Sequence, residues 1–156
     1  MADDFLSARL EHAFDIRVDF GADRMLSQAM SGGGRHGYTP PHGGTITGPR
    51  LNGKVVPHSG GDFAIMRDDG VLELNTHYML QADDGTMIYI HGTGYLISGG
   101  GGENDQGLEQ PAYFKFTPQF RVEHGVHDWM MRTVFVAAGE RRRDPDHSLF
   151  RYYAVV

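Results

Sequence analysis

Residues 67–97 read RDDGVLELNTHYMLQADDGTMIYIHGTGYLI, and this stretch decides the fold. Asp-Asp-Gly turns at 68–70 and 83–85 border runs in which apolar and polar side chains alternate. Alternation with a period of two is typical of a strand with one buried face, and Asp-Gly is a strong signal for a turn between strands. The stretch therefore predicts two neighbouring antiparallel strands, at 71–82 and 86–97.

The same pattern continues on both sides. We expect further strands at 10–20, 45–57, 62–67, 112–122, 129–138 and 148–156, with long loops near 21–44 and 98–110. The 22 glycines, together with many Phe and Tyr residues, fit short strands joined by tight turns. About eight antiparallel strands close readily into a barrel that holds one small ligand. We therefore predict that residues 1–156 form a single all-β domain, an antiparallel β-barrel with meander connections, in which 1–9 and 98–110 are flexible.

Composition excludes several classes of protein. The chain has no cysteine, so disulfides, thiolate metal sites and thiol catalysis are excluded. A formal net charge of −6 argues against nucleic acid as a partner. No run approaches the roughly 20 apolar residues of a membrane helix, and the first residues, MADDFLSARLEHAF, contain no apolar run typical of a secretory signal. We expect no membrane partner and a cytoplasmic location.

Several expected strands are apolar on both faces, and the one at 129–138 is an example. Val134 and Val136 alternate there with Phe135 and Ala137. In a barrel, one face fills the interior while the other packs against something else, often a second subunit. A homo-oligomer is therefore expected.

Two histidines on neighbouring strands are the first candidates for chemistry. In the strand at 71–82, Glu73, Asn75 and His77 share one face, which either faces water or forms the wall of a cavity. The next strand carries Tyr89 and His91 on a similar mixed face, and two such stripes favour a pocket wall. Because imidazole titrates near neutrality, we predict His77 and His91 as acid/base groups and Tyr89 as a hydrogen-bond donor.

The segment PHSGGDF at 57–63 supplies a candidate carboxylate. Gly60-Gly61 permits a sharp bend, after which Asp62 is either a turn residue or a group at the barrel mouth that orients an imidazole or acts as a base. A second Pro-His-Gly segment lies at 41–43. We predict that His42 and His58 face each other across the opening and bind substrate.

The remaining candidates are aromatic or apolar. Trp129 and Met131 are either core residues or, with Phe116, the apolar wall of a pocket for an aromatic molecule. Tyr113 is a further candidate hydrogen-bond donor.

No spacing in the sequence predicts a cofactor. Nine histidines invite a metal site, but H-x-H, H-x-x-x-H and H-E-x-x-H are all lacking, and His124 and His127 lie in a Gly-containing loop expected to face solvent. The Gly-rich run at 98–110 is not followed by a Gly-Lys-Ser/Thr phosphate-binding sequence. We predict neither a metal nor a cofactor.

Several motifs in order resemble a known family. These are GGTITGPRLNGKVVPHSGGD (43–62), RDDGVLELNTHYMLQADDG (67–85), YFKFTPQF (113–120), FVAAGER (135–141) and YYAVV (152–156). Together they are similar to domain of unknown function 3237, an uncharacterised bacterial and fungal family. The resemblance implies a small β-barrel that tends to associate, without an established general activity.

This chain departs from the usual family pattern at three places. Thr76-His77-Tyr78 stands for Ala-Arg-Tyr, Trp129-Met130-Met131 for Trp-Leu-Asn, and Gly60-Gly61-Asp62-Phe63 for Gly-Gly-Ala-Asp-Trp. These departures favour a specialised substrate.

The sequence thus favours a cofactor-independent enzyme that binds a small aromatic or polycyclic metabolite and catalyses proton-transfer chemistry of the isomerase, cyclase or lyase type. The alternative is a non-catalytic small-molecule-binding barrel. A structural subunit of a larger assembly is a third hypothesis, which rests only on the strands that are apolar on both faces.

Overall fold

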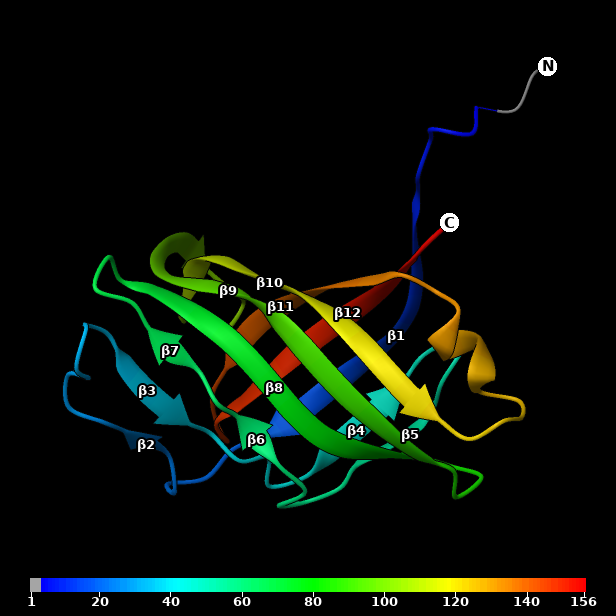
Figure 1. The fold of residues 1–156 in the computed structure, drawn as a ribbon, viewed down its shortest axis with the longest axis horizontal. Coiled ribbons are helices and arrows are strands. Elements are labelled where there is room, and N and C mark those ends of the chain that lie inside the picture. Colours follow the sequence, from blue (N-terminus) through cyan, green and yellow to red (C-terminus); the bar gives the residue numbers. More distant parts are fainter. Residues whose placement is uncertain (1–3) are drawn as a thin grey trace.

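The computed structural model describes residues 4–156, and its regular elements are antiparallel strands and one short 3-10 helix (Figure 1). The elements are β1 (Leu10–Asp19), β2 (Met25–Leu26), β3 (Arg35–Tyr38), β4 (Gly44–Thr47), β5 (Gly53–Val55), β6 (Gly61–Asp62), β7 (Ile65–Met66), β8 (Val71–Ala82), β9 (Met87–Glu103), β10 (Glu109–Val122), the 3-10 helix η1 (Asp128–Met131), β11 (Phe135–Arg142) and β12 (His147–Val155). No helix in this part of the chain is long and apolar enough to cross a membrane.

Eight strands form a closed ring, which confirms the predicted barrel. Their order is β8–β9–β10–β11–β12–β1–β4–β5, and β5 pairs again with β8. The strands predicted at 71–82 and 86–97 pair in register from Val71 opposite Ile97 to Gln81 opposite Met87. The short strands β2, β3 and β7 extend from β8 outside the ring, and β6 also pairs with β8. Figure 1 shows β7 beside the N-terminal part of β8, with β3 and β2 beyond it.

An aromatic cluster fills one part of the barrel interior. The Phe14 and Tyr152 rings stack with centroids 4.9 Å apart, and Phe120 and Phe135 meet edge to face at 5.1 Å. All four side chains are buried. Aromatic pairs in these geometries stabilise a core beyond the area they bury.

The structure decides which face of β8 points inward. Leu74, Tyr78 and Leu80 are buried, whereas Asn75 and the other residues of the alternate face lie on the outside of the barrel. The face with Leu74 and Leu80 thus packs in the core, and the face with Glu73, Asn75 and His77 does not line the cavity inside the barrel.

Five expected elements differ in the structure. The strand expected at 45–57 is divided into β4 and β5, and the strand expected at 62–67 is divided into β6 and β7. Residues 98–103 and 109–110, expected in a loop, extend β9 and β10 into a long hairpin. The strand expected at 129–138 begins only at Phe135, because residues 128–131 form η1. The region 21–44 is not wholly irregular, since it contains β2 and β3.

The strand at 129–138 that was expected to be apolar on both faces corresponds to β11. Phe135 and Ala137 are buried in the core, while Val134, just before β11, is 69% exposed. The expected flexible segment 1–9 falls partly outside the described residues, and Arg9 exchanges backbone hydrogen bonds with Val156.

Candidate functional site

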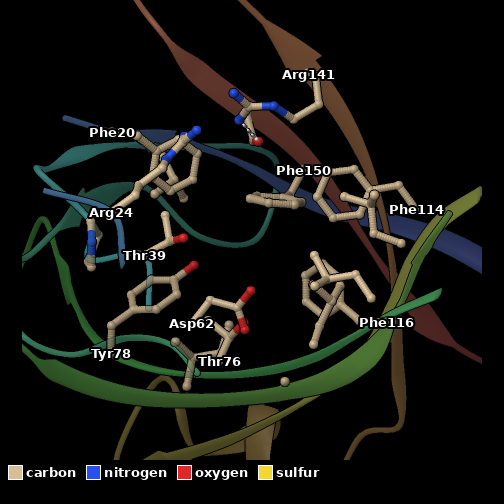
Figure 2. A pocket seen from close by; sticks show the side chains of 18 of the residues that line it. Phe20, Arg24, Thr39, Asp62, Thr76, Tyr78, Phe114, Phe116, Arg141 and Phe150 are labelled. Atoms are coloured by element: carbon tan, nitrogen blue, oxygen red, sulfur yellow. Dashed lines mark hydrogen bonds between the residues drawn. The ribbon is translucent and has the colours of Figure 1, made fainter. Parts of the chain in front are cut away.

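A cavity of about 190 Å³ lies inside the barrel (Figure 2). Its lining comes from the inner faces of the ring strands and from the segments at 20–24, 39–41 and 62. The lining residues are Val18, Phe20, Arg24, Thr39, Pro41, Asp62, Leu72, Leu74, Thr76, Tyr78, Ile90, Gly92, Leu96, Phe114, Phe116, Arg141, Ser148, Phe150 and Tyr152. An apolar space of about 150 Å³ is large enough for benzene, so this cavity has room for a ligand of about one ring.

Asp62 is the carboxylate of the cavity. Figure 2 shows its side chain pointing inward beside Thr76 and Tyr78. Its Oδ1 accepts hydrogen bonds from the Asn75 backbone N–H (2.9 Å) and from Thr76 Oγ1 (3.1 Å). Within residues 4–156 it forms no ion pair, and Oδ2 accepts no hydrogen bond. Burial raises the pKa of Asp62 above its ordinary value of 3.8, although the two hydrogen bonds oppose this.

Two tyrosines add neutral hydroxyl groups to the same cavity. Tyr152 is fully buried, and its hydroxyl is the one buried side-chain polar atom without a hydrogen-bond partner in the described chain. Burial raises the pKa of both Tyr78 and Tyr152, so both phenols stay protonated at neutral pH. The two hydroxyls lie close enough for each to affect the pKa of the other, and the Tyr152 hydroxyl would donate to a ligand that comes within its reach.

Positive charge gathers at another side of the cavity. Arg24 and Arg141 both lie over the Phe20 ring, 4.8 and 5.3 Å from its centroid. Asp146 pairs with both guanidinium groups, with Arg24 at 2.8 Å, and Arg141 also donates to Ser148 Oγ at 2.7 Å. Burial lowers the pKa of Arg24, but an arginine remains charged at neutral pH. Two guanidinium groups thus line this side of the cavity, with Asp146 paired to both and Asp23 also near Arg24, and a ligand with an electron-rich oxygen could accept from them.

The apolar wall is aromatic. Phe150 meets Phe114 and Phe116 edge to face at 5.3 and 5.4 Å. Gly92 lets the Phe116 ring lie against β9, because a Cβ there would be 2.9 Å from Phe116 Cδ2. The structure thus brings two predicted site residues, Asp62 and Phe116, into one cavity.

Neither His77 nor His91 lines this cavity, and their predicted role as acid/base groups stays a prediction. Both rings lie on the outer face of the barrel, stacked with centroids 3.9 Å apart. Each Nε2 donates to Asn75 Oδ1, at 3.1 and 3.0 Å, and the Tyr89 hydroxyl is bonded to His77 Nδ1. Burial and the neighbouring His77 lower the pKa of His91. The alternation of β8 and β9 places their aliphatic faces inside, and the polar stripe therefore lies outside.

The other predicted residues are also outside the cavity. Tyr113 is 43% exposed beside an outer groove that also holds His91 and Tyr95. Trp129 packs against the core at η1, with Arg50 over its ring at 3.6 Å, which fits its alternative role as a core residue. Met131 is 46% exposed, and its Sδ accepts from the Val122 N–H at 3.4 Å.

The His42 and His58 rings lie against each other, but they are not placed across the cavity as the prediction had them. Their ring centroids are 4.7 Å apart, and neither ring lines the cavity. Their predicted role in substrate binding stays a prediction.

Sequence reasoning missed the arginines and Tyr152. Arg141 begins the charged run RRRDPD at 141–146, which is typical of a solvated turn, and Arg24 lies in a segment without a recognisable pattern. Tyr152 did carry a signal, since it alternates with Phe150 and Ala154 on the inner face of β12.

Comparison with known proteins identifies the family. The profile described as "Protein of unknown function (DUF3237)" matches residues 8–155. The chain belongs to the DUF3237 family. A UPF0311 protein of Rhodopseudomonas palustris (strain TIE-1) is 32% identical over 141 residues, covering 86% of this chain and 89% of the relative. A UPF0311 protein of Clostridium acetobutylicum is 33% identical over 129 residues, covering 78% of each.

Solved structures agree with the DUF3237 barrel. A β-barrel-like protein from Acinetobacter baumannii superimposes with a TM-score of 0.82 at 26% identity, covering 98% of this chain and 99% of that one. A protein described as an enzyme, from Penicillium herquei, has a TM-score of 0.70 at 16% identity over the full length of both chains. This second likeness concerns the fold alone.

Proposed function

We propose that this DUF3237 protein binds a small aromatic metabolite of about one ring in the barrel and transfers a proton on it without a cofactor. The observation that carries the proposal is Asp62, a buried carboxylate without a cationic partner in the described chain, in a cavity whose wall is mostly apolar. Burial without charge compensation makes a carboxylate a stronger base than usual, and such groups concentrate at functional sites.

The geometry supports isomerisation next to a carbonyl. Asp62 Oδ2 takes the proton from the carbon beside the carbonyl, and the C–H electron pair becomes the new C=C bond of an enolate. Negative charge then develops on the substrate oxygen, where Tyr152 Oη donates a hydrogen bond. Return of the same proton to a different carbon completes an isomerisation. In a cyclase, the enolate carbon would instead attack a double bond elsewhere in the substrate, the π electrons of that bond would move to its other atom, and Asp62 would return the proton to that atom.

The cavity also suits ligand binding without chemistry. Apolar walls with a few placed polar groups are typical of carrier barrels as well as of enzymes. The unpartnered Tyr152 hydroxyl favours a bound ligand in either case. The alternative function is therefore a non-catalytic small-molecule-binding barrel.

Exchange in D2O tests the proposal and separates it from the alternative. The purified chain is incubated with single-ring and fused-ring phenols and aromatic ketones, and binding and loss of the carbon-bound proton are followed by ¹H NMR. We expect at least one ketone to bind and to exchange faster with protein than in buffer. Binding without exchange would support the carrier function instead, and failure of every compound to bind would overturn both.

We also propose that the protein is a homo-oligomer that associates through the outer face of β9 and β10. Tyr95 and Tyr113 are 49% and 43% exposed there, beside the outer groove. Light scattering after size exclusion should give at least twice the monomer mass, and Tyr95→Glu with Tyr113→Glu should lower it to the monomer. Val126→Glu, in the loop after β10, should leave the mass unchanged. A monomeric wild-type protein would contradict this prediction.

A further inference from the structure

Three potential metal ligands meet outside the cavity. Asp23 follows β1, His42 precedes β4, and His58 lies between β5 and β6. One ligand atom from each lies within 4.8 Å of the others. His42 Nε2 and Asp23 Oδ1 are hydrogen-bonded at 2.7 Å, and the two imidazole rings meet nearly edge to face. Segments 19 and 16 residues apart in the sequence thus converge at one point.

We propose that Asp23, His42 and His58 bind a divalent transition-metal ion of the zinc class. Two imidazoles and one carboxylate are a donor set that Zn²⁺ accepts, and three protein ligands leave a coordination position for water or an exchangeable ligand. All three side chains are accessible to solvent, so an ion can enter without a structural change. A metal ion bound at His42 Nε2 replaces the proton of the hydrogen bond between this nitrogen and Asp23 Oδ1. The Asp23 carboxylate then binds the metal ion instead of the proton.

The backbone holds the two histidines in position. The His42 N–H donates to Asp19 O at 2.8 Å, and the His58 N–H donates to Pro41 O at 2.9 Å. The His42 ring rests against Gly21, where a Cβ would lie 2.2 Å from its Cε1. His58 has a φ of 56°, in the left-handed region that few non-glycine residues adopt. Strain of this kind concentrates at functional sites, where neighbouring structure maintains it.

Other histidine–carboxylate pairs lack the third ligand. The pairs are His12 with Asp15, His124 with Asp128 and His127 with Asp84, at 2.8–2.9 Å. Within residues 4–156, only the cluster of Asp23, His42 and His58 gathers three such groups. The other pairs therefore provide matched controls.

The site adjoins the cavity along the chain. Asp23 is followed by Arg24, and His42 is preceded by Pro41; both of these neighbours line the cavity. A bound ion joins the two segments that carry them. It should therefore stabilise the folded protein against heat, since a ligand that binds only the folded state raises the Tm.

Calorimetric titration with Zn²⁺ tests the proposal on the full chain, stripped with EDTA and free of any purification tag. Wild type should bind one equivalent. Asp23→Asn, His42→Ala and His58→Asn should each weaken binding at least tenfold, because each removes one ligand. Asn at position 58 tolerates the left-handed backbone and removes the imidazole. His124→Ala should bind like wild type.

Two further readouts separate this site from other histidines. Co²⁺ should give visible absorption bands that the three ligand variants lose, and Zn²⁺ should raise the Tm of wild type but not theirs. Gly21→Ala should also weaken binding, since its Cβ displaces the His42 ring. Lack of zinc binding by wild type would overturn the proposal. So would binding that survives in the folded ligand variants but is lost in His77→Ala, because the stacked His77–His91 pair would then be the site.

Discussion

Asp62→Asn should lower the rate of proton exchange on a ketone that the barrel binds by about 10²–10⁴-fold, the usual contribution of a general base. The amide keeps the shape of the carboxylate, and its oxygen can still accept from Asn75 N–H and Thr76 Oγ1. The base is lost while the cavity is retained. Binding of the ketone, measured by NMR titration, should change far less than the rate.

The same substitution should stabilise the protein at neutral pH. Burial raises the pKa of Asp62 above 3.8, so the folded chain holds this proton more tightly than the unfolded chain. The free energy of unfolding of wild type should therefore fall as the pH rises from below 3.8 through the raised pKa, and then level off. The free energy of unfolding of Asp62→Asn lacks this pH dependence. The variant should therefore become more stable than wild type as the pH rises through this range, by about 1 kcal/mol at pH 7, a common gain when a functional group is removed.

Denaturant unfolding at several pH values, together with the exchange assay, checks both halves of this prediction. His77→Ala in the same assay separates the cavity from the histidines predicted from the sequence, since His77 lies on the outer face. The assignment of Asp62 as the base would be contradicted if Asp62→Asn left the exchange rate unchanged. A large loss of exchange in His77→Ala would then point to His77 instead.

The barrel could be predicted because its signals are local. Alternation along β8 and β9 and the Asp-Asp-Gly turns act between neighbours in the chain, so periodicity reveals them. The β9–β10 hairpin was missed at 98–110 because glycine-rich sequence usually marks a loop. Backbone pairing holds this stretch, for example Glu103 opposite Glu109, and such pairing depends on the partner strand rather than on propensity.

The site was harder to predict because alternation gives two faces without saying which is inside. The stripe of Asn75, His77 and His91 resembled a pocket wall, yet closing the ring turned it outward. Asp62 was found because Gly60-Gly61 marked a bend next to a carboxylate. Arg24 and Arg141 are brought together because both pair with Asp146. Arg24 and Asp146 lie more than a hundred residues apart in the sequence, so no local pattern reveals this contact.

The histidine cluster shows the same limit for metal ligands. Spacing rules such as H-x-H detect ligands on one strand or helix. His42 and His58 instead stand on separate connections whose ends are brought together by the pairing of β4 with β5 and of β5 with β8. The sequence supplied their facing arrangement as a hypothesis, but Asp23 entered only with the fold.

Tyr152→Ala should destabilise the protein by about 3–5 kcal/mol, as expected for removing a large, fully buried aromatic ring from a core. The ring stacks on Phe14 at 4.9 Å and meets Phe116 edge to face at 5.7 Å, so alanine leaves a void between the core and the cavity. Urea unfolding followed by circular dichroism measures the loss.

Tyr152→Phe is the matched control, and it separates the ring from the hydroxyl. The ring packing is kept and a buried hydroxyl without a partner is removed, so stability should stay equal or rise by up to about 1 kcal/mol. Affinity for a ligand with a carbonyl or phenolate oxygen should nevertheless fall about tenfold, because that oxygen loses its donor. A Tyr152→Phe variant that is clearly less stable than wild type would show that the hydroxyl is bonded within the folded chain, and its role as a donor to the ligand would then be lost.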